Sequence, residues 1–462
     1  EKKVSRRGKS LTISLDAELQ RIAEDSIQEM VIKVSKVRIL PDLDWRKTIL
    51  RRTNQALLGS NEKKVSAQLL LSAFLDAPFP LDGSQASTVA GFQGTPKDAD
   101  RLLKMLYAKG VLSKPNMEID QYELAPPPLP PGAAVLIDLK NAEILALASK
   151  PNYDLSQLTP FIPQSVYDQI QRREAWLPRA WHPGYAPASP FKLVTAIAGY
   201  RAGQLEANAT MKCDGIYRGM ECHVFPGVHG EVNLRDAISQ SCNVYFFRLA
   251  EKIGYQNLID TAKLMKLNSS PSIEIPTLRD NPIVPDPDWK KKRIGVRWTL
   301  EDTFNISIGQ GGLRQSPLQM ACMAAQIATN RQFFQPTLIH GVNSSLPPSP
   351  SLGLNQEFLD EIISGMHKAT RKGTARRCQI KDIPVAGKTG TGQWRNHNMN
   401  LNLAWFVGFA PVDEPEVAVA TLVEGVIPQD HVQGGLTATP IARDLLQAYF
   451  DQKRAKLALD RN

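Results

Sequence analysis

The chain has 462 residues, of which 42% are hydrophobic and 22% charged, and these values exclude a fibrous or wholly disordered protein. At roughly 100–200 residues per domain, the length predicts two or three domains, or one large domain with an insertion. The net charge of +9 is compatible with an anionic partner, but no nucleic-acid-binding motif accompanies it, so we expect no nucleic-acid partner.

The N-terminus gives no sign of a membrane segment. No apolar run reaches the roughly 20 residues that span a bilayer, and no signal peptide is recognisable, so we expect the chain as given to be soluble. Five of the first nine residues are Lys or Arg. They are either a solvated terminus or the remnant of a segment that followed a membrane anchor.

The first predicted elements are a strand over residues 11–15, where polar and apolar residues alternate, and a helix from Asp16 to about Met30. Two apolar runs, 133–139 and 143–149, predict a hairpin. We expect this hairpin to pair with the strand at 11–15. Residues 31–131, which end in a stiff proline-rich linker, would then be a small helical or α+β module inserted into a domain formed by residues 1–30 and 132–462.

The five cysteines show neither a Cys-x-x-Cys motif nor a Cys/His spacing typical of zinc sites. Cys213 and Cys222 are close enough in the chain for a local disulfide, and two reduced thiols are the alternative. Cys322 lies among small and apolar residues and is expected in the core. We expect neither a metal nor an organic cofactor.

The first motif with chemical potential is Ser189-Pro190-Phe191-Lys192, which precedes an apolar helical stretch. Proline suits the first helical position, so we expect Ser189 to cap the helix and Lys192 to lie on the same face one turn later. A lysine whose pKa is lowered by burial and by nearby cations can take the serine proton and create a nucleophile. The alternative is a capping serine beside a surface lysine.

The second motif is Ser241-Cys242-Asn243, which precedes an aromatic run. Alternation by two predicts Ser241 and Asn243 on one side and Cys242 on the other. A hydroxyl can relay a proton, and an amide can both donate and accept hydrogen bonds. The alternative is an ordinary turn before a core helix.

The third motif is Lys388-Thr389-Gly390, followed by Thr391. A strand with a glycine lets a substrate backbone lie close beside it. The lysine and threonine would then present a charge and a hydroxyl to a carboxylate. The alternative is a glycine turn.

In this order, the three motifs are the set found in penicillin-binding proteins and class A β-lactamases. The chain resembles a penicillin-binding protein transpeptidase domain, and the resemblance extends to the glycine-rich segment 307–311 and to the strand-like segment 404–410. The resemblance implies an α+β fold, with an antiparallel sheet flanked by helices and an all-helical subregion. Residues 31–131 have no counterpart in it.

Within this family, the stretch 213–243 and the segment 440–443 are similar to the elongation-type class B branch, which includes penicillin-binding protein 2. The branch usually has a membrane helix and a pedestal region ahead of the transpeptidase domain, and we expect neither within the sequence as given. The resemblance implies a place at the periplasmic, extracytoplasmic face of the bacterial inner membrane. It also implies three partners: peptidoglycan stem peptides, β-lactam antibiotics and a membrane glycosyltransferase of the elongation machinery.

The resemblance implies a role for each motif residue in a D,D-transpeptidase. Ser189 attacks the carbonyl between the last two D-alanines of a stem peptide, and Lys192 takes its proton. Ser241 passes a proton towards the leaving D-alanine, and Asn243 holds the substrate amide. The acyl-enzyme is then resolved by the amine of a neighbouring strand, which creates the cross-link.

The third motif is expected to bind the donor and to stabilise the developing charge. Lys388 and Thr389 bind the terminal carboxylate, and Lys388 lowers the pKa of Lys192. Gly390 belongs to the same substrate-binding strand. The backbone N–H groups of Ser189 and Thr391 form the oxyanion hole, where one donor contributes about 3–4 kcal/mol in other acyl-transfer enzymes.

Three alternatives remain at this point. Residues 301–305 match Glu-x-x-x-Asn, the pattern of the deacylation loop of class A β-lactamases, and Glu301 would be the deacylating base. We interpret the match as coincidence, because it runs directly into the glycine-rich segment. A D,D-carboxypeptidase would use water in place of the amine, and a non-enzymatic β-lactam sensor or scaffold would retain only the fold.

Overall fold

The computed structural model describes residues 10–34, 112–113, 123–124, 129–275, 281–396, 399–426 and 430–460. The chain divides into two compact units, one of residues 1–31, 131–428 and 432–462, the other of residues 32–130 and 429–431. In the second unit, the strands β1 (Leu112–Ser113) and β2 (Glu123–Leu124) pair antiparallel. Most of the inserted module predicted over 31–131 lies outside the described residues, so its nature and the domain limits stay predictions.

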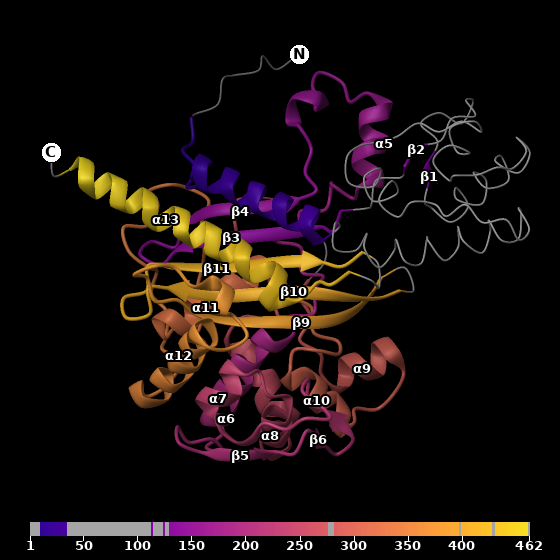
Figure 1. Ribbon diagram of the computed structural model, residues 1–462, viewed down its shortest axis with the longest axis vertical. Coiled ribbons are helices and arrows are strands. Elements are labelled where there is room, and N and C mark those ends of the chain that lie inside the picture. The colour runs from indigo at the N-terminus through magenta and orange to yellow at the C-terminus, as the bar shows by residue number, and fades with distance from the viewer. Residues whose placement is uncertain are drawn as a thin grey trace, which may run out of the picture. The chain divides into compact units, whose positions relative to one another are not determined.

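The first unit is built on a five-stranded antiparallel sheet of order β4-β3-β11-β10-β9 (Figure 1). The strands are β3 (Gly132–Asp138), β4 (Ile144–Lys150), β9 (Ala386–Asn396), β10 (Met399–Ala410) and β11 (Val417–Glu424). The hairpin predicted over 133–149 is confirmed as β3 and β4. Strand β9, which carries the third motif, lies at an edge of the sheet.

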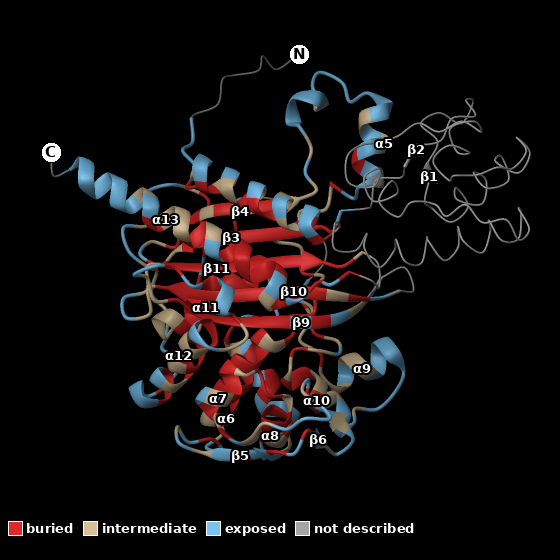
Figure 2. Cartoon of the chain, in the orientation of Figure 1, coloured by how far each residue is buried: buried red, intermediate tan, exposed pale blue. Residues whose placement is uncertain are grey.

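Both faces of the sheet are covered, which explains why the central strands are almost continuously apolar. Every residue of β11 is buried, and β11 packs against both α11 (Pro317–Thr329) and α13 (Thr439–Leu459) (Figure 2). The helix over residues 17–34 is linked to α13 by a hydrogen bond from the Ser26 hydroxyl to Asp444. The edge strand β9 is therefore held by a sheet whose central strands are shielded from water.

A mainly helical region lies beyond β9 (Figure 1). Its principal helices are α6 (Lys192–Arg201), α7 (Leu234–Ser239), α8 (Asn243–Leu264), α10 (Leu300–Ser307) and α12 (Gln356–Arg371). The sequence predicts an all-helical subregion, but this region also contains two short antiparallel strand pairs. These are β5 (Thr210–Cys213) with β8 (Gly230–Asn233) and β6 (Ile216–Tyr217) with β7 (Met220–Glu221). Helix α9 (Pro287–Ile294) also belongs to this region, whereas α5 (Gln164–Arg172) lies outside it, on the other side of the sheet in the view of Figure 1.

Local sequence sets several helix boundaries. Helix α11 starts with a capping box, in which Ser316 and Gln319 each accept a hydrogen bond from the backbone N–H of the other, and Pro317 fills the first helical position. It ends at Asn330, which adopts a left-handed conformation with φ of 51°. Helix α10 has the same kind of box, formed by Thr299 and Asp302.

The strand predicted over residues 11–15 is not formed. Only an isolated bridge joins Ile13 to Ile339, and the hairpin contact consists of hydrogen bonds from the Ser14 hydroxyl to the Ile144 carbonyl and from the Asp16 N–H to the Leu145 carbonyl. Leu11 and Ile13 are 65% and 53% exposed, whereas Ser14 is buried. Leu11 and Ile13 of the alternating pattern thus face away from the core, and only Leu15 packs against it. A strand at 11–15 would therefore bury little apolar surface.

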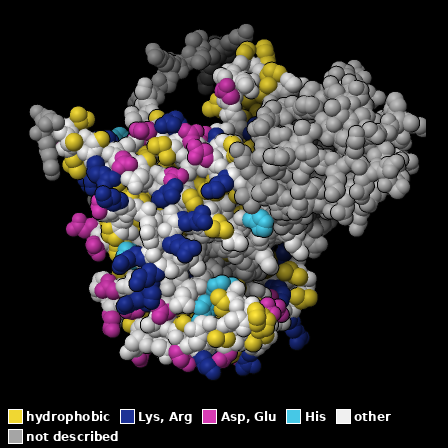
Figure 3. Space-filling view, in the orientation of Figure 1, with side chains coloured by type: hydrophobic (Ala, Val, Ile, Leu, Met, Phe, Trp, Pro, Cys, Tyr) yellow, Lys and Arg dark blue, Asp and Glu magenta, His cyan; other side chains and the backbone are white. Residues whose placement is uncertain are grey.

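Charged side chains of both signs lie on the surface of the described part. Figure 3 shows Lys and Arg side chains in several groups on the visible face, with Asp and Glu between them. Among the described residues, no helix combines the length and the hydropathy that are needed to cross a bilayer.

Candidate active site

Ser189 is the first residue of a 3₁₀ turn, Ser189–Phe191, that continues directly into α6. The residue at the capping position is Ala188, so the expectation that Ser189 caps the helix is wrong. No side-chain capping bond is made, and the Ser189 hydroxyl is left available. Its backbone N–H lies at a helix N-terminus, where the first N–H groups have no intrahelical acceptor.

Ala188 holds this turn in a conformation that suits glycine. Its φ of 53° and ψ of −154° lie in a region that other residues rarely adopt, at a cost of about 1–3 kcal/mol. The Ala188 N–H donates to the Gly309 carbonyl at 2.9 Å, and a Cβ on Gly309 would lie 2.0 Å from the Ala188 oxygen. The glycine-rich segment is therefore needed for the close approach that fixes the serine turn.

A buried ion-pair network fixes the segment ahead of the serine turn. The Glu424 carboxylate accepts hydrogen bonds from the Arg179 guanidinium and from the Tyr185 hydroxyl, both at 2.8 Å. The Trp405 indole N–H donates to the Ala186 carbonyl at 2.9 Å. The chain is thus tied to β10 and β11 a few residues before Ser189.

Lys192 is fully buried and joins the first motif to the second. Its ammonium nitrogen donates to the Ser241 carbonyl at 2.7 Å, to the Ser241 hydroxyl at 3.1 Å and to the Asn243 side-chain oxygen at 2.7 Å. In the described part of the chain, no hydrogen bond joins Lys192 to the Ser189 hydroxyl. Catalytic hydrogen bonds are often loose in ligand-free proteins and tighten when substrate is bound.

Lys388 joins the third motif to the same hydroxyl. It is fully buried on β9, and its ammonium nitrogen donates to the Ser241 hydroxyl at 2.9 Å and to the Thr389 carbonyl at 3.0 Å. The three motifs, which are separated by about 50 and 150 residues in the chain, therefore meet at one serine oxygen. Two charged lysines that share one acceptor repel each other, and this repulsion lowers the pKa of at least one of them.

The pKa values of both lysines are lowered, mainly because both are buried. Burial lowers the pKa of Lys192 to about 8. Burial, together with the charge of Lys192, lowers the pKa of Lys388 well below its ordinary value. The expected cause is thus reversed: the charge of Lys192 acts on Lys388, and desolvation is the main cause at Lys192. At neutral pH the two lysines do not both hold a full positive charge, and the fraction of the chain in which Lys192 is neutral can use it as a base.

The third motif lies along the edge strand. A Cβ on Gly390 would lie 2.5 Å from Pro190 Cδ and 3.2 Å from the Ser189 nitrogen, so only glycine allows the strand to pass this close to the serine turn. The Thr389 hydroxyl donates to the Thr374 hydroxyl at 2.6 Å. The Thr391 hydroxyl accepts from the Gly434 N–H at 3.1 Å. An extended peptide can add to such an edge.

Ser189, Ser241, Asn243, Thr389 and Thr391 line one cavity of about 1170 Å³. The cavity also contains residues that sequence reasoning missed: Asn305, Gln310, Thr374, Arg376 and Arg377. Thr374 follows α12 in an ordinary turn, and only its contact with Thr389 marks it. Glu301 is exposed and does not line the cavity.

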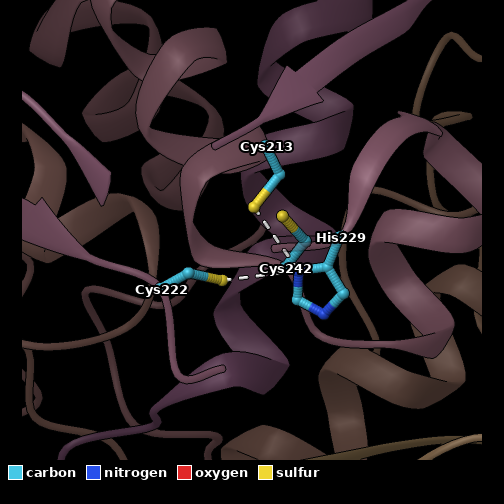
Figure 4. Close-up of side chains that lie close together, drawn as sticks. All are labelled: Cys213, Cys222, His229 and Cys242. Atoms are coloured by element: carbon cyan, nitrogen blue, oxygen red, sulfur yellow. Dashed lines mark hydrogen bonds between the residues drawn. The ribbon is translucent and has the colours of Figure 1, made fainter. Parts of the chain in front are cut away.

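A second cluster lies directly behind the second motif. Cys213 ends β5, Cys222 follows β7, His229 precedes β8, and Cys242 caps α8 (Figure 4). Their ligand atoms could hold a metal ion. All five cysteines of the chain are free, and a hydrogen bond with Cys242 lowers the pKa of the Cys222 thiol. The spacing of these residues resembles no zinc motif because strand pairing, not a short loop, brings them together.

Comparison with known proteins places this site in a family. Residues 132–447 match the family described as penicillin binding protein transpeptidase domain. The chain belongs to this family, and its relatives place it in the class B, penicillin-binding protein 2-like branch. The α+β fold that the sequence predicts is thereby confirmed.

Two relatives and one solved structure illustrate the match. The peptidoglycan D,D-transpeptidase MrdA of Acinetobacter baumannii is 28% identical over 63% of this chain and 48% of its own length. PbpA of Mycobacterium tuberculosis is 30% identical over 69% of this chain and 66% of its own. Pseudomonas aeruginosa PBP2, in a complex with WCK 5153, shares 26% identity and a TM-score of 0.62 over 69% of this chain and 74% of that chain. The chain spans about half the length of the first curated relatives that it matches.

Proposed function

We propose that this chain is a peptidoglycan D,D-transpeptidase that works through a serine acyl-enzyme. The observation that carries the proposal is the pair of buried lysines, Lys192 and Lys388, which meet at the Ser241 hydroxyl beneath the cavity that Ser189 lines. Acyl transfer through a serine requires a base, a group that relays a proton and a free hydroxyl near backbone N–H donors. Lys192, Ser241 and Ser189 at its helix N-terminus supply these three components. The names of the relatives support the same activity.

The chain's own groups account for each step. Lys192 in its neutral form takes the Ser189 proton as the serine attacks the carbonyl of the penultimate D-alanine. Ser241 passes a proton to the amine of the departing D-alanine, and Asn243 orients the donor amide. An amine from a second stem peptide then attacks the ester and restores Ser189.

The edge strand β9 recognises the donor. Lys388 and Thr389 bind the terminal carboxylate, and Gly390 lets the peptide lie close to the strand. The backbone N–H groups of Ser189 and Thr391 stabilise the oxyanion of the tetrahedral intermediate. β-Lactams, whose ring carbonyl and carboxylate imitate the end of the stem peptide, acylate the same serine.

We further propose an extracytoplasmic position at the bacterial inner membrane, in a complex with a membrane glycosyltransferase of the elongation machinery. Two solved relatives support an assembly of this kind, the complex of Helicobacter pylori PBP2 with MreC and a peptidoglycan synthase complex that couples polymerization and crosslinking.

Burst kinetics with a chromogenic cephalosporin separates this proposal from a β-lactamase. Deacylation needs a base beside the ester, and Glu301, the one residue with the matching pattern, is exposed outside the cavity. We expect about one equivalent of product per chain and then near arrest. Sustained turnover that disappears in Glu301→Ala would instead establish a β-lactamase.

A stem-peptide assay separates the transpeptidase from a D,D-carboxypeptidase. With a donor peptide and an amine acceptor, a transpeptidase gives a cross-linked product, whereas a carboxypeptidase gives only the shortened donor. If the chain forms neither the cross-linked product nor the shortened donor, yet is stably labelled by a β-lactam, the result would favour a non-enzymatic β-lactam sensor.

A further inference from the structure

Two exposed arginines lie on the wall of the active-site cavity that adjoins the third motif. Arg376 and Arg377 belong to the 3₁₀ turn Arg376–Cys378, which follows α12, and both line the cavity. In the described part of the chain, neither guanidinium forms an ion pair or a side-chain hydrogen bond. Among the described residues that line the cavity, the one carboxylate is that of Glu221, whose backbone carbonyl contacts Asn243 of the second motif. The charge of the arginines is therefore available to a ligand in the cavity.

Thr374 holds this turn beside the third motif. The Thr389 hydroxyl donates to the Thr374 hydroxyl at 2.6 Å, and both threonines line the cavity. The Cys378 side chain at the end of the turn is fully buried, and a Cβ on Gly435 would lie 2.4 Å from the Thr374 carbonyl oxygen, so the backbone of the turn is closely packed. The arginines come directly after the Thr374 contact in the chain, and their long side chains can reach a ligand that is bound to Thr389.

The charge of Lys388 is not exposed in the same cavity. Lys388 is fully buried, its ammonium nitrogen donates to the Ser241 hydroxyl and to the Thr389 carbonyl, and it is not among the residues that line the cavity. Lys388 therefore acts on a bound carboxylate from within the protein. A cation at the cavity surface is needed for direct contact. Guanidinium groups stay charged at all working pH values and bind carboxylates through two parallel N–H bonds.

The proposed reaction brings a carboxylate to this part of the site in both half-reactions. In the first, the departing D-alanine carries a carboxylate on the carbon that bears its nitrogen. In the second, the acceptor amine attacks from the position that this nitrogen has left, since the second half-reaction reverses the path of the first. An acceptor whose amine and carboxylate share one carbon, as at one end of a diaminodicarboxylic acid, places its carboxylate where that of D-alanine was. A simple alkyl amine has no such group.

We propose that Arg376 and Arg377 form a carboxylate-binding subsite on the leaving-group side of the cavity, and that this subsite selects acceptors whose amine and carboxylate share one carbon. The inference rests on the proposed transpeptidase activity. The two arginines hold the carboxylate and thereby orient the neutral amine towards the ester carbonyl of the acyl-enzyme. The C–N bond then forms, the bond to the Ser189 oxygen breaks, and the proton that the amine releases returns to that oxygen.

The acceptor test uses the full chain and an N-acyl-D-alanyl thioester with an uncharged leaving group, which forms the acyl-enzyme without a donor carboxylate. D-Alanine and D-alaninamide are compared as acceptors, with kcat/KM expressed per neutral amine because the two amines differ in pKa. We expect D-alanine to be preferred by about 10–100-fold, the range for hydrogen bonds to a charged group. The double variant Arg376→Gln/Arg377→Gln should reduce this preference about tenfold or more, mainly through a higher KM for D-alanine. Arg371→Gln, at an exposed arginine in the last turn of α12 outside the cavity, should keep it.

The possible outcomes separate the subsite from the activity on which it rests. Equal use of the two acceptors by the parent chain, or an unchanged preference in the double variant, would overturn the subsite and leave the proposed activity in place, because both acceptors still give a transfer product. A parent chain that transfers the acyl group to neither acceptor would overturn the activity and the subsite together. The comparison in the parent chain needs no variant, so it tests the subsite even if the double variant folds poorly.

The donor half-reaction is measured with N-acyl-D-alanyl-D-lactate, an ester donor that keeps the terminal carboxylate, and with its methyl ester. The ratio of kcat/KM for the acid to kcat/KM for the methyl ester should fall about tenfold or more in the double variant, and Arg371→Gln should keep the parent ratio. An unchanged ratio in the double variant would overturn the role of the subsite in donor binding.

Discussion

Replacement of Lys192 by alanine is expected to slow acylation by a β-lactam by about 10²–10⁴-fold, the usual contribution of a positioned general base. Lys192 is fully buried, and its ammonium nitrogen donates to Ser241 and Asn243, so alanine removes the basic group and leaves both acceptors without this donor. Alanine leaves the serine turn intact because the fold of the turn depends on Ala188 and Gly309. The rate constant for acylation is measured by stopped-flow fluorescence.

Lys252→Ala is the matched control, because Lys252 is an exposed lysine on α8, the helix that begins at Asn243. It should acylate at the parent rate. If Lys192→Ala also acylates at the parent rate while its thermal unfolding is unchanged, Lys192 is not the base.

The acylation rate is expected to rise with pH and to level off above about pH 8. The neutral amine is the active form, and burial lowers the pKa of Lys192 to about 8. Below that value the neutral fraction, and with it the rate, should fall about tenfold for each pH unit. Measurement of the acylation rate constant from about pH 5.5 to about pH 9.5 tests this pH dependence directly.

The same titration with Ser189→Ala gives the chemical background of β-lactam opening. A rate that stays constant from neutral to basic pH would contradict the role of Lys192. It would instead favour Lys388, whose pKa is held well below its ordinary value by burial and by the charge of Lys192.

The sequence predicts the site residues better than their local structure. Each motif is short and has an ordinary alternative, so Ser189, Lys192 and Lys388 are predicted as site residues only from the order of the three motifs and from the family resemblance that this order carries. That both lysines meet at the Ser241 hydroxyl depends on how β9 packs beside α6 and α8, and no local pattern contains that information. Ala188 shows the same limit, because its strained φ is imposed by its contact with Gly309, far away in the chain.

Two misses have a common physical origin. The strand at 11–15 was predicted from alternation, but Ile13 faces outward, since the buried partner is the Ser14 hydroxyl. The cluster around His229 was missed because its members come from separate short strands, whose pairing brings Cys213 beside Gly230. In both cases tertiary contacts, which the local sequence does not encode, decide the outcome.

Fluorescent penicillin labelling, followed by peptide mass spectrometry of the adduct, tests the central claim most directly. Ser189 lines the cavity one turn before Lys192, and no capping bond occupies its hydroxyl, so the penicilloyl group should be found on Ser189 alone. Ser189→Ala should abolish labelling and leave thermal unfolding unchanged within about 1 kcal/mol, since the hydroxyl makes no capping bond. An adduct on another residue, or labelling that persists in Ser189→Ala, would contradict the account.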